Sequence, residues 1–225
     1  MEGPPKLVPE PTRSFELCPD NLPRDSEGLV LWEELFEGAR PLRVEIGVGT
    51  STFLIDVAEQ NPAHGFIGIE YSAKRVAKFL KKVECRGVVN IRMLRVDAVR
   101  WIRKLFGPGS IDHFYVNHPD PWPKRRHQKK RFVNQHNAAL IAEFLRPGGG
   151  LSLRTDFAEY AEQMLEVLDK TPALANSCGE GCFASSPREP TRTLYETKFL
   201  LAGMQIFYLE YEKIGGHGNA ISHAH

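Results

Sequence analysis

The central part of the chain, residues 42–170, alternates short apolar runs with longer segments in which apolar residues recur every three or four positions. The short runs predict buried strands, and the longer segments predict amphipathic helices. We expect strands at 42–49, 65–70, 90–97, 111–116 and 150–156, and helices at 50–61, 72–87, 98–107, 133–149 and 160–170. Such strict alternation predicts an α/β fold, in which helices cover both faces of a mostly parallel sheet.

Three further segments outside this alternation carry a recognisable pattern. Residues 25–36 begin with an N-cap candidate, Asp25, and have apolar residues at helical spacing, so a helix is expected there. Residues 192–199 and 204–213 are β-like, and we expect them to pair antiparallel at one edge of the sheet.

The two ends of the chain differ from the centre in composition. Prolines crowd residues 1–24 and disfavour regular structure, which predicts an N-terminal arm. Glycine and histidine dominate residues 214–225, which predicts a disordered tail. The expected organisation is therefore the arm, a single folded domain at 25–213, and the tail.

Composition and charge limit the function classes. The chain carries 29 Lys and Arg against 28 Asp and Glu, so its net charge of +1 offers no bulk attraction to a polyanion, and any such site must be local. No apolar run approaches the roughly 20 residues that span a membrane. Residues 1–15 are proline-rich and lack the apolar region of a signal peptide, so we do not expect export. Cys178 and Cys182 lack a His or Cys partner at zinc-finger spacing, so we predict no metal site and a reduced, cytoplasmic setting.

A glycine-containing loop follows the first strand of the alternating region. In "VEIGVGTSTF", Gly47 and Gly49 stand at the carboxyl end of that strand, where open α/β sheets bind ligands. A tight strand-to-helix turn is the alternative reading, because two glycines alone are a weak signal. Thr52 occupies the third glycine position of the dinucleotide fingerprint, which argues against a nicotinamide cofactor.

Carboxylates lie on or at the ends of the first three strands. Glu70 could accept hydrogen bonds from ribose hydroxyls, and Asp97 with Ala98 could bind the amino group of an adenine. Glu45 would lie near a positively charged group of the bound ligand. Each one alone could be a helix cap or a solvated strand end. A pyrophosphate would be repelled by the set, so the pattern favours a cationic nucleoside.

The stretch "HPDPWPKRRHQKKR" follows the fourth strand of the alternating region. Its prolines hold Asp120 and Trp122 on a stiff loop. Trp122 could stack on a base or simply pack within the loop. The basic residues that follow could neutralise nucleic-acid phosphates, with a solvated helix start as the alternative; they are Lys124, Arg125, Arg126, Lys129, Lys130 and Arg131.

These motifs together resemble known families. "VEIGVGT", "GIE" and "VDAV" resemble the class I S-adenosylmethionine-dependent methyltransferases, which implies their Rossmann-like fold. "PDPWPKRRHQKKR", "RTDFAEYAEQMLEV" and "TRTLYE" resemble motifs of the tRNA (guanine-N7)-methyltransferase family. The likeness runs from about Arg43 to Lys213. Asn117 and His118 depart from it, standing where many members have apolar or aromatic residues, and "TKFLLAG" after Glu196 replaces a frequent Arg-Gly pair.

The resemblance implies a site and a reaction. The cofactor would be S-adenosylmethionine and the partner tRNA, methylated on the variable-loop guanine by a monomer or homodimer without an obligate protein partner. Asp120 would be the catalytic residue. The implied cofactor-binding residues are Glu45, Glu70, Asp97 and Asp120, to which the strand-end motifs add Gly47, Gly49 and Ala98. The implied substrate-binding residues are Lys124, Asp156, Thr193 and Glu196, to which the basic run adds Arg125 and Arg126.

Guanine chemistry divides the roles further. Because N7 carries an exposed lone pair, transfer needs alignment more than a strong base. A carboxylate matches the donors on the Watson–Crick edge of guanine, and Asp156 is the preferred candidate for that contact, with Asp120 holding the reacting geometry. An inactive RNA-binding protein on the same fold and a nicotinamide-dependent oxidoreductase remain the alternatives.

Overall fold

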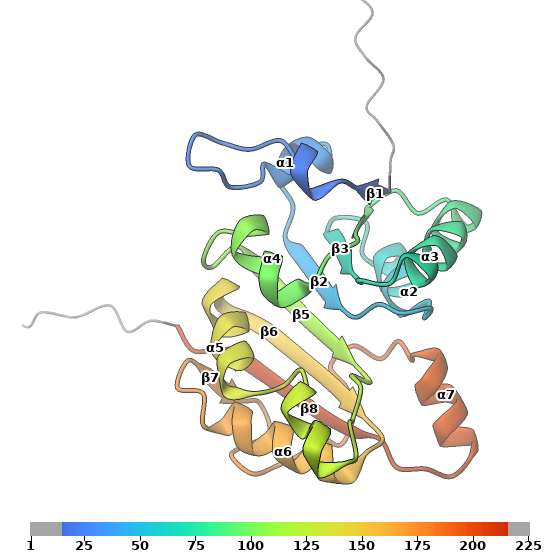
Figure 1. Cartoon of the computed structure of the whole chain (residues 1–225), viewed down its shortest axis with the longest axis vertical. Coiled ribbons are helices and arrows are strands. Elements are labelled where there is room, and N and C mark those ends of the chain that lie inside the picture. The colour runs from blue at the N-terminus through green and yellow to red at the C-terminus, as the bar shows by residue number, and fades with distance from the viewer. Residues whose placement is uncertain (1–14, 216–225) are drawn as a thin grey trace, which may run out of the picture.

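The computed structural model describes residues 15–215, which form one eight-stranded sheet flanked by helices (Figure 1). The strand order is β1-β4-β3-β2-β5-β6-β8-β7. All neighbours from β1 to β6 pair in parallel, and β8 is antiparallel to both β6 and β7. The predicted Rossmann-like fold, with a mostly parallel sheet, an antiparallel edge and helices on both faces, is confirmed.

The elements follow one another in the expected alternation. The strands are β1 (Glu16–Leu17), β2 (Leu42–Ile46), β3 (Gly65–Ile69), β4 (Ile91–Leu94), β5 (Ile111–Asn117), β6 (Leu145–Thr155), β7 (Leu174–Asn176) and β8 (Phe207–Lys213). The α-helices are α1 (Trp32–Leu35), α2 (Phe53–Gln60), α3 (Ala73–Arg86), α4 (Ala98–Leu105), α5 (Gln135–Phe144), α6 (Ala158–Asp169) and α7 (Leu194–Leu201), and the 3-10 helices are η1 (Pro19–Asn21) and η2 (Arg125–Lys130).

Two apolar cores lie on the opposite faces of the sheet. Alternate residues of β3 show the division, because Ile67 and Ile69 belong to one core and Phe66 to the other. The first core is completed by α4, α5 and α6, and the second by α2 and α3. Gly68 allows close packing in the second core, since a Cβ there would lie 2.7 Å from the Met93 sulfur.

The order of the strands reverses at β2. Val44 of β2 pairs in parallel with Ile67 of β3 on one side and with Phe114 of β5 on the other. From β2 the chain winds outward to β3 and β4, then returns to β5 and continues to β6 in the opposite direction. Loops at the carboxyl ends of β2 and β5 therefore diverge, and such a switch point is where open α/β sheets bind ligands.

Three predicted elements differ from those observed. The helix expected at 133–149 ends at Phe144, and β6 begins at Leu145, because Pro147 and the glycines after it do not favour a helix. Within the expected helix at 25–36 only α1 is helical, because Asp25 Oδ1 accepts hydrogen bonds from the backbone N–H groups of Glu27 and Leu29 and closes a turn. Residues 192–199 were expected to be a strand, but Thr193 and Glu196 form a capping box that starts α7. β8 pairs instead with β6 and with β7, a strand that the pattern did not predict.

Part of the N-terminal arm belongs to the fold. Glu16 and Leu17 pair with Met93 and Leu94 of β4, and η1 follows directly. Ordered structure therefore begins before the expected boundary at residue 25. Residues 1–14 of the arm and 216–225 of the tail lie outside the described residues. Among residues 15–215, no helix combines the length and apolar character needed to cross a bilayer.

Candidate active site

Two cavities open side by side at the switch point between β2 and β5. Their volumes are about 480 and 300 Å³. Five residues line both of them, namely Gly47, Arg75, Asn117, His118 and Asp120. The sequence-predicted cofactor residues are divided between the two cavities, and several of the predicted substrate residues line neither.

The larger cavity contains most of the expected cofactor residues: Gly47, Glu70, Asp97, Ala98 and Asp120. Gly47 and Gly49 have φ angles of 79° and 62°, a region in which glycine carries no steric penalty. The buried Glu70 carboxylate accepts hydrogen bonds from the backbone N–H groups of Gly49 at 3.1 Å and Ser72 at 2.9 Å. Glu70 thus joins the glycine loop to the start of α3.

Asp97 begins α4 at the rim of this cavity. Its Oδ1 accepts a hydrogen bond from the backbone N–H of Arg100 at 3.2 Å, so Asp97 is the N-cap of the helix. Its side chain is still 54% exposed. Asp97 can therefore cap α4 and still accept a hydrogen bond from a ligand in the cavity.

Glu45 lies in the smaller cavity together with Gly49, Asp156, Thr193, Tyr195 and Phe199. The Glu45 side chain is buried, and its Oε1 accepts a hydrogen bond from Asn117 Nδ2 at 2.8 Å. Its Oε2 is buried and has no hydrogen-bond partner among the described residues. Burial raises the pKa of Glu45 to about 8, against the opposing effects of Asn117 and Arg154.

His118 and Asp156 contact each other in the lining of the smaller cavity. His118 Nδ1 lies 3.3 Å from Asp156 Oδ1, and the side chains are 8% and 27% exposed, respectively. The imidazole packs against Tyr195 and Phe199 of α7, with ring centroids 6.2 and 5.8 Å away. Burial lowers the pKa of His118, although the contact with Asp156 acts in the opposite direction.

Asp120 is exposed where the cavities meet, and within residues 15–215 its carboxylate takes part in no hydrogen bond or ion pair. Trp122, two residues later, is packed within the loop: Lys130 Nζ lies 4.7 Å from its ring centroid, and the His127 ring meets it edge-on at 5.8 Å. Loop packing is therefore the observed environment of Trp122.

The basic segment separates into three parts. Lys124, Arg125 and Arg126 are exposed and line neither cavity, whereas Lys129 and Lys130 are exposed and line the larger one. Arg131 does not fit the expectation of a phosphate contact, because it is buried. Its Nε donates a hydrogen bond to the Pro121 carbonyl at 2.8 Å, and its Nη2 pairs with Glu159 of α6 at 3.1 Å.

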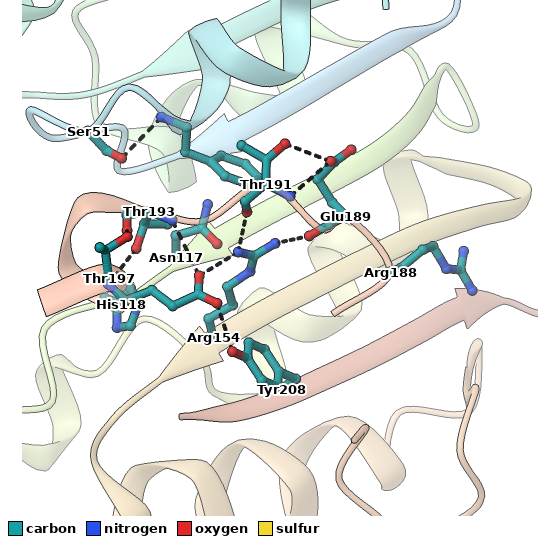
Figure 2. Close-up of polar contacts among 12 residues, drawn as sticks. Ser51, Asn117, His118, Arg154, Arg188, Glu189, Thr191, Thr193, Thr197 and Tyr208 are labelled. Carbon is teal, nitrogen blue, oxygen red and sulfur yellow. Dashed lines mark hydrogen bonds and ion pairs between the residues drawn. The ribbon is translucent and has the colours of Figure 1, made fainter. Parts of the chain in front are cut away.

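Arg154 of β6 is fully buried and pairs with the start of α7, the helix whose Tyr195 and Phe199 line the smaller cavity (Figure 2). Its Nη1 pairs with Glu196 Oε2 at 2.7 Å. The guanidinium also donates to the carbonyl oxygens of Thr191 at 2.6 Å and Glu189 at 2.5 Å. Tyr208 completes the cluster, because its hydroxyl group donates a hydrogen bond to Glu196 Oε1 at 2.7 Å.

This cluster changes the interpretation of Glu196. Glu196 does not fit the expected contact with the substrate. Its carboxylate is buried, lines neither cavity and is already paired with Arg154. Thr193, its partner in the capping box, does line the smaller cavity. Sequence reasoning gave Arg154 no role, although a charge within the apolar run "LSLRT" is a signal for a buried ion pair.

The part of the chain that the structure describes contains no group of three or more His, Cys, Asp or Glu side chains that could hold a metal ion. Cys178 and Cys182 are free and exposed.

Comparison with known proteins identifies the family. Residues 39–209 match a family model described as "Putative methyltransferase". The tRNA (guanine-N(7)-)-methyltransferase of Cutibacterium acnes is 41% identical over 80% of this chain and 66% of its own length. The enzyme of the same name from Geobacter metallireducens is 33% identical over 88% of this chain and 92% of its own length.

Solved structures agree on the fold. The 30S ribosomal A1408 methyltransferase from an uncultured bacterium superposes with a TM-score of 0.55 at 16% identity, over 81% of this chain and 92% of that one. On the strength of the family model and the sequence relatives, the chain belongs to the tRNA (guanine-N7)-methyltransferase family.

Proposed function

We propose that this chain transfers the methyl group of S-adenosylmethionine to N7 of a guanine in tRNA. The observation that carries the proposal is the pair of cavities that meet at the unpaired Asp120 carboxylate. One cavity suits a nucleoside cofactor and the other an acceptor base. The relatives named for this activity support the same reaction.

The residues of the site fit a cationic nucleoside. Glu45 lines the smaller cavity but contacts Asn117, which lines both. Its Oε2 is buried without a partner, which is costly unless a donor such as the ammonium group of a cofactor that extends past Asn117 reaches it. Glu70 is fixed at the end of β3 by backbone hydrogen bonds and is suited to accept from ribose hydroxyls. Asp97 and Ala98 would face the adenine. When bound, S-adenosylmethionine supplies a methyl group activated by a sulfonium centre.

The chain itself contributes alignment. Guanine N7 has a lone pair available at neutral pH, so no side chain has to remove a proton from it. The rigid loop around Asp120 holds its carboxylate between the two cavities, and holding reacting groups in line is worth several orders of magnitude in rate. Asp156 offers a carboxylate to the acceptor base in the smaller cavity, and Thr193, which lines the same cavity, is buried and caps α7.

The exposed basic residues provide the contact with the nucleic-acid backbone. Lys124, Arg125 and Arg126 on η2 and its start extend the positive surface away from Lys129 and Lys130 at the larger cavity. The variable-loop guanine is the position that we expect to be modified.

Two measurements test this function. Mass spectrometry of tRNA nucleosides should detect 7-methylguanosine that disappears when the chain is removed from the cell. In addition, S-adenosylmethionine should raise the melting temperature of the purified protein and NAD should not, since a ligand that binds only the native state stabilises it. Stabilisation by NAD would favour the oxidoreductase alternative, and bound tRNA without methyl transfer would favour the inactive RNA-binding alternative.

A further inference from the structure

His118 joins three segments around the smaller cavity. It follows the last residue of β5, its Nδ1 lies 3.3 Å from Asp156 Oδ1 just after β6, and its ring packs against Tyr195 and Phe199 of α7. It also lines both cavities. A substitution of His118 therefore changes the immediate surroundings of the Asp156 carboxylate, which we assign to the acceptor base.

The backbone fixes the imidazole in place. His118 has a φ of 46°, and its N–H donates a hydrogen bond to the Arg154 carbonyl oxygen at 2.8 Å. Pro119 follows and restricts the conformation further. His and Asn are among the non-glycine residues that adopt this left-handed region most readily.

The protonation state gives the two ring nitrogens different roles. Burial lowers the pKa of His118, which keeps the imidazole neutral at neutral pH. A neutral imidazole has one N–H, and contact with a carboxylate places it on Nδ1. Nε2 is then an acceptor, and it is buried without a partner. The only hydrogen bond of the ring within the described chain is therefore directed at Asp156.

Asp156 retains capacity for a ligand. Its side chain is 27% exposed, and the contact with His118 is its only hydrogen bond within residues 15–215. One carboxylate has about four lone-pair sites, so Oδ2 and part of Oδ1 stay available toward the cavity. Without His118, the carboxylate would be free to rotate toward solvent.

We propose that His118 is a positioning residue that fixes the Asp156 carboxylate to accept hydrogen bonds from the N1–H and N2 amino groups of the target guanine. The inference rests on the proposed function and deepens it, because it identifies what sets the preference for guanine. The competing role is purely spatial, in which the imidazole only fills the gap between β6 and α7.

Two substitutions separate these roles. His118→Asn keeps an N–H on the atom next to Cγ, where Nδ1 stands, but loses most of the ring packing on Tyr195 and Phe199. His118→Phe keeps an aromatic ring and loses the donor. Positioning requires the Asn variant to behave like the wild type and the Phe variant to fail, whereas a spatial role requires the reverse.

The measurement uses single-turnover methyl transfer to two ligated tRNAs, with guanosine or inosine at the position that the wild-type protein methylates. Inosine keeps N7 and N1–H but lacks the N2 amino group. We expect wild type and His118→Asn to prefer guanosine by about 10-fold or more, the scale of one hydrogen bond to a charged acceptor. In His118→Phe the preference should fall to within about 3-fold. His136→Ala, an exposed histidine of α5 that lines neither cavity, is the matched control and should keep the wild-type ratio.

The outcomes are distinct. A wild-type preference in His118→Phe, equal loss in both variants, or a wild-type protein that ignores the N2 amino group would overturn the inference and leave the proposed function intact. A wild-type protein that methylates no guanine in tRNA would refute the proposed function itself. Melting temperatures identify variants that do not fold, and His118→Leu, which fills the gap with an apolar side chain and lacks a donor, then replaces the Phe variant. In combination with Asp156→Asn, His118→Phe should cause little additional loss, because coupled residues are not additive.

Discussion

The two cavities that meet at Asp120 are built in different ways. In the larger one, Gly47 and Glu70 come directly after β2 and β3, and Asp97 follows the end of β4 by three residues, so the parallel sheet alone brings them to one edge. The smaller one combines Glu45 with Asp156 and with α7, which a buried ion pair holds in place. Side-chain contacts therefore shape the acceptor side, whereas backbone topology shapes the cofactor side.

The largest expected effect is obtained by breaking the ion pair that holds α7. Arg154→Met leaves the buried Glu196 carboxylate unpaired and should lower the free energy of unfolding by about 3–5 kcal/mol. Urea denaturation measures this loss. Arg188→Met is the matched control, because Arg188 pairs with Glu212 at 3.6 Å on the exposed surface and should cost less than about 1 kcal/mol. Equal losses would mean that the cavity wall does not depend on the buried pair.

Asp120→Asn tests the point where the two cavities join. The substitution keeps the shape but removes the charge and exchanges one acceptor for a donor. Single-turnover methyl transfer should fall on the order of 100-fold, the scale of misalignment at a reacting centre. Affinity for tRNA, measured separately, should change far less. Transfer within a few-fold of wild type would make Asp120 a loop-structuring residue and shift attention to Asp156.

Glu45→Gln sharpens the electrostatic difference between the cavities. The folded pKa of Glu45, about 8, lies above its ordinary value of 4.5, so the folded state retains a proton that the unfolded chain loses. Wild-type stability should therefore fall as pH rises from about 5 to 8, on the order of 3 kcal/mol from this group. In the Glu45→Gln variant this pH-dependent loss of stability should be absent. Urea denaturation of both proteins at pH 5 and pH 8 measures the difference. S-adenosylmethionine should offset the loss of wild-type stability at pH 8. If the free energy of unfolding depends on pH in the same way in both proteins, the pKa of Glu45 is not raised.

The smallest expected effect lies outside both cavities. Replacing Lys124, Arg125 and Arg126 with Gln should weaken tRNA binding and reduce the log–log salt slope by roughly 0.7–0.9 for each lost phosphate contact. Affinity for S-adenosylmethionine should stay unchanged, since these side chains line neither cavity. Lys170→Gln, which removes the exposed pair with Glu166 on α6, is the control. An unchanged salt slope in the triple variant would mean that these three side chains contact solvent and not tRNA phosphates.

The same contrast explains what the sequence could predict. Strand ends and glycine loops are local features, so Gly47, Glu70, Asp97 and Asp120 could be placed correctly at the carboxyl edge from the pattern alone. The segment from residue 192 was predicted as a strand because "TLYETKF" is rich in β-branched and aromatic residues. The capping box of Thr193 and Glu196 outweighed that propensity, with Arg154 pairing across a long sequence separation. Such a partner is invisible without the fold, and the contact between His118 and Asp156 is equally non-local.

Both edges of the sheet end in very short strands. β1 has two residues and β7 has three, so neither edge of the described sheet offers a long row of unpaired N–H and C=O groups. Long free edges are templates on which another chain can add a strand, and short outer strands reduce that hazard. We therefore expect self-association of this chain, where it occurs, to use helical or loop surfaces and not a continuous intermolecular sheet.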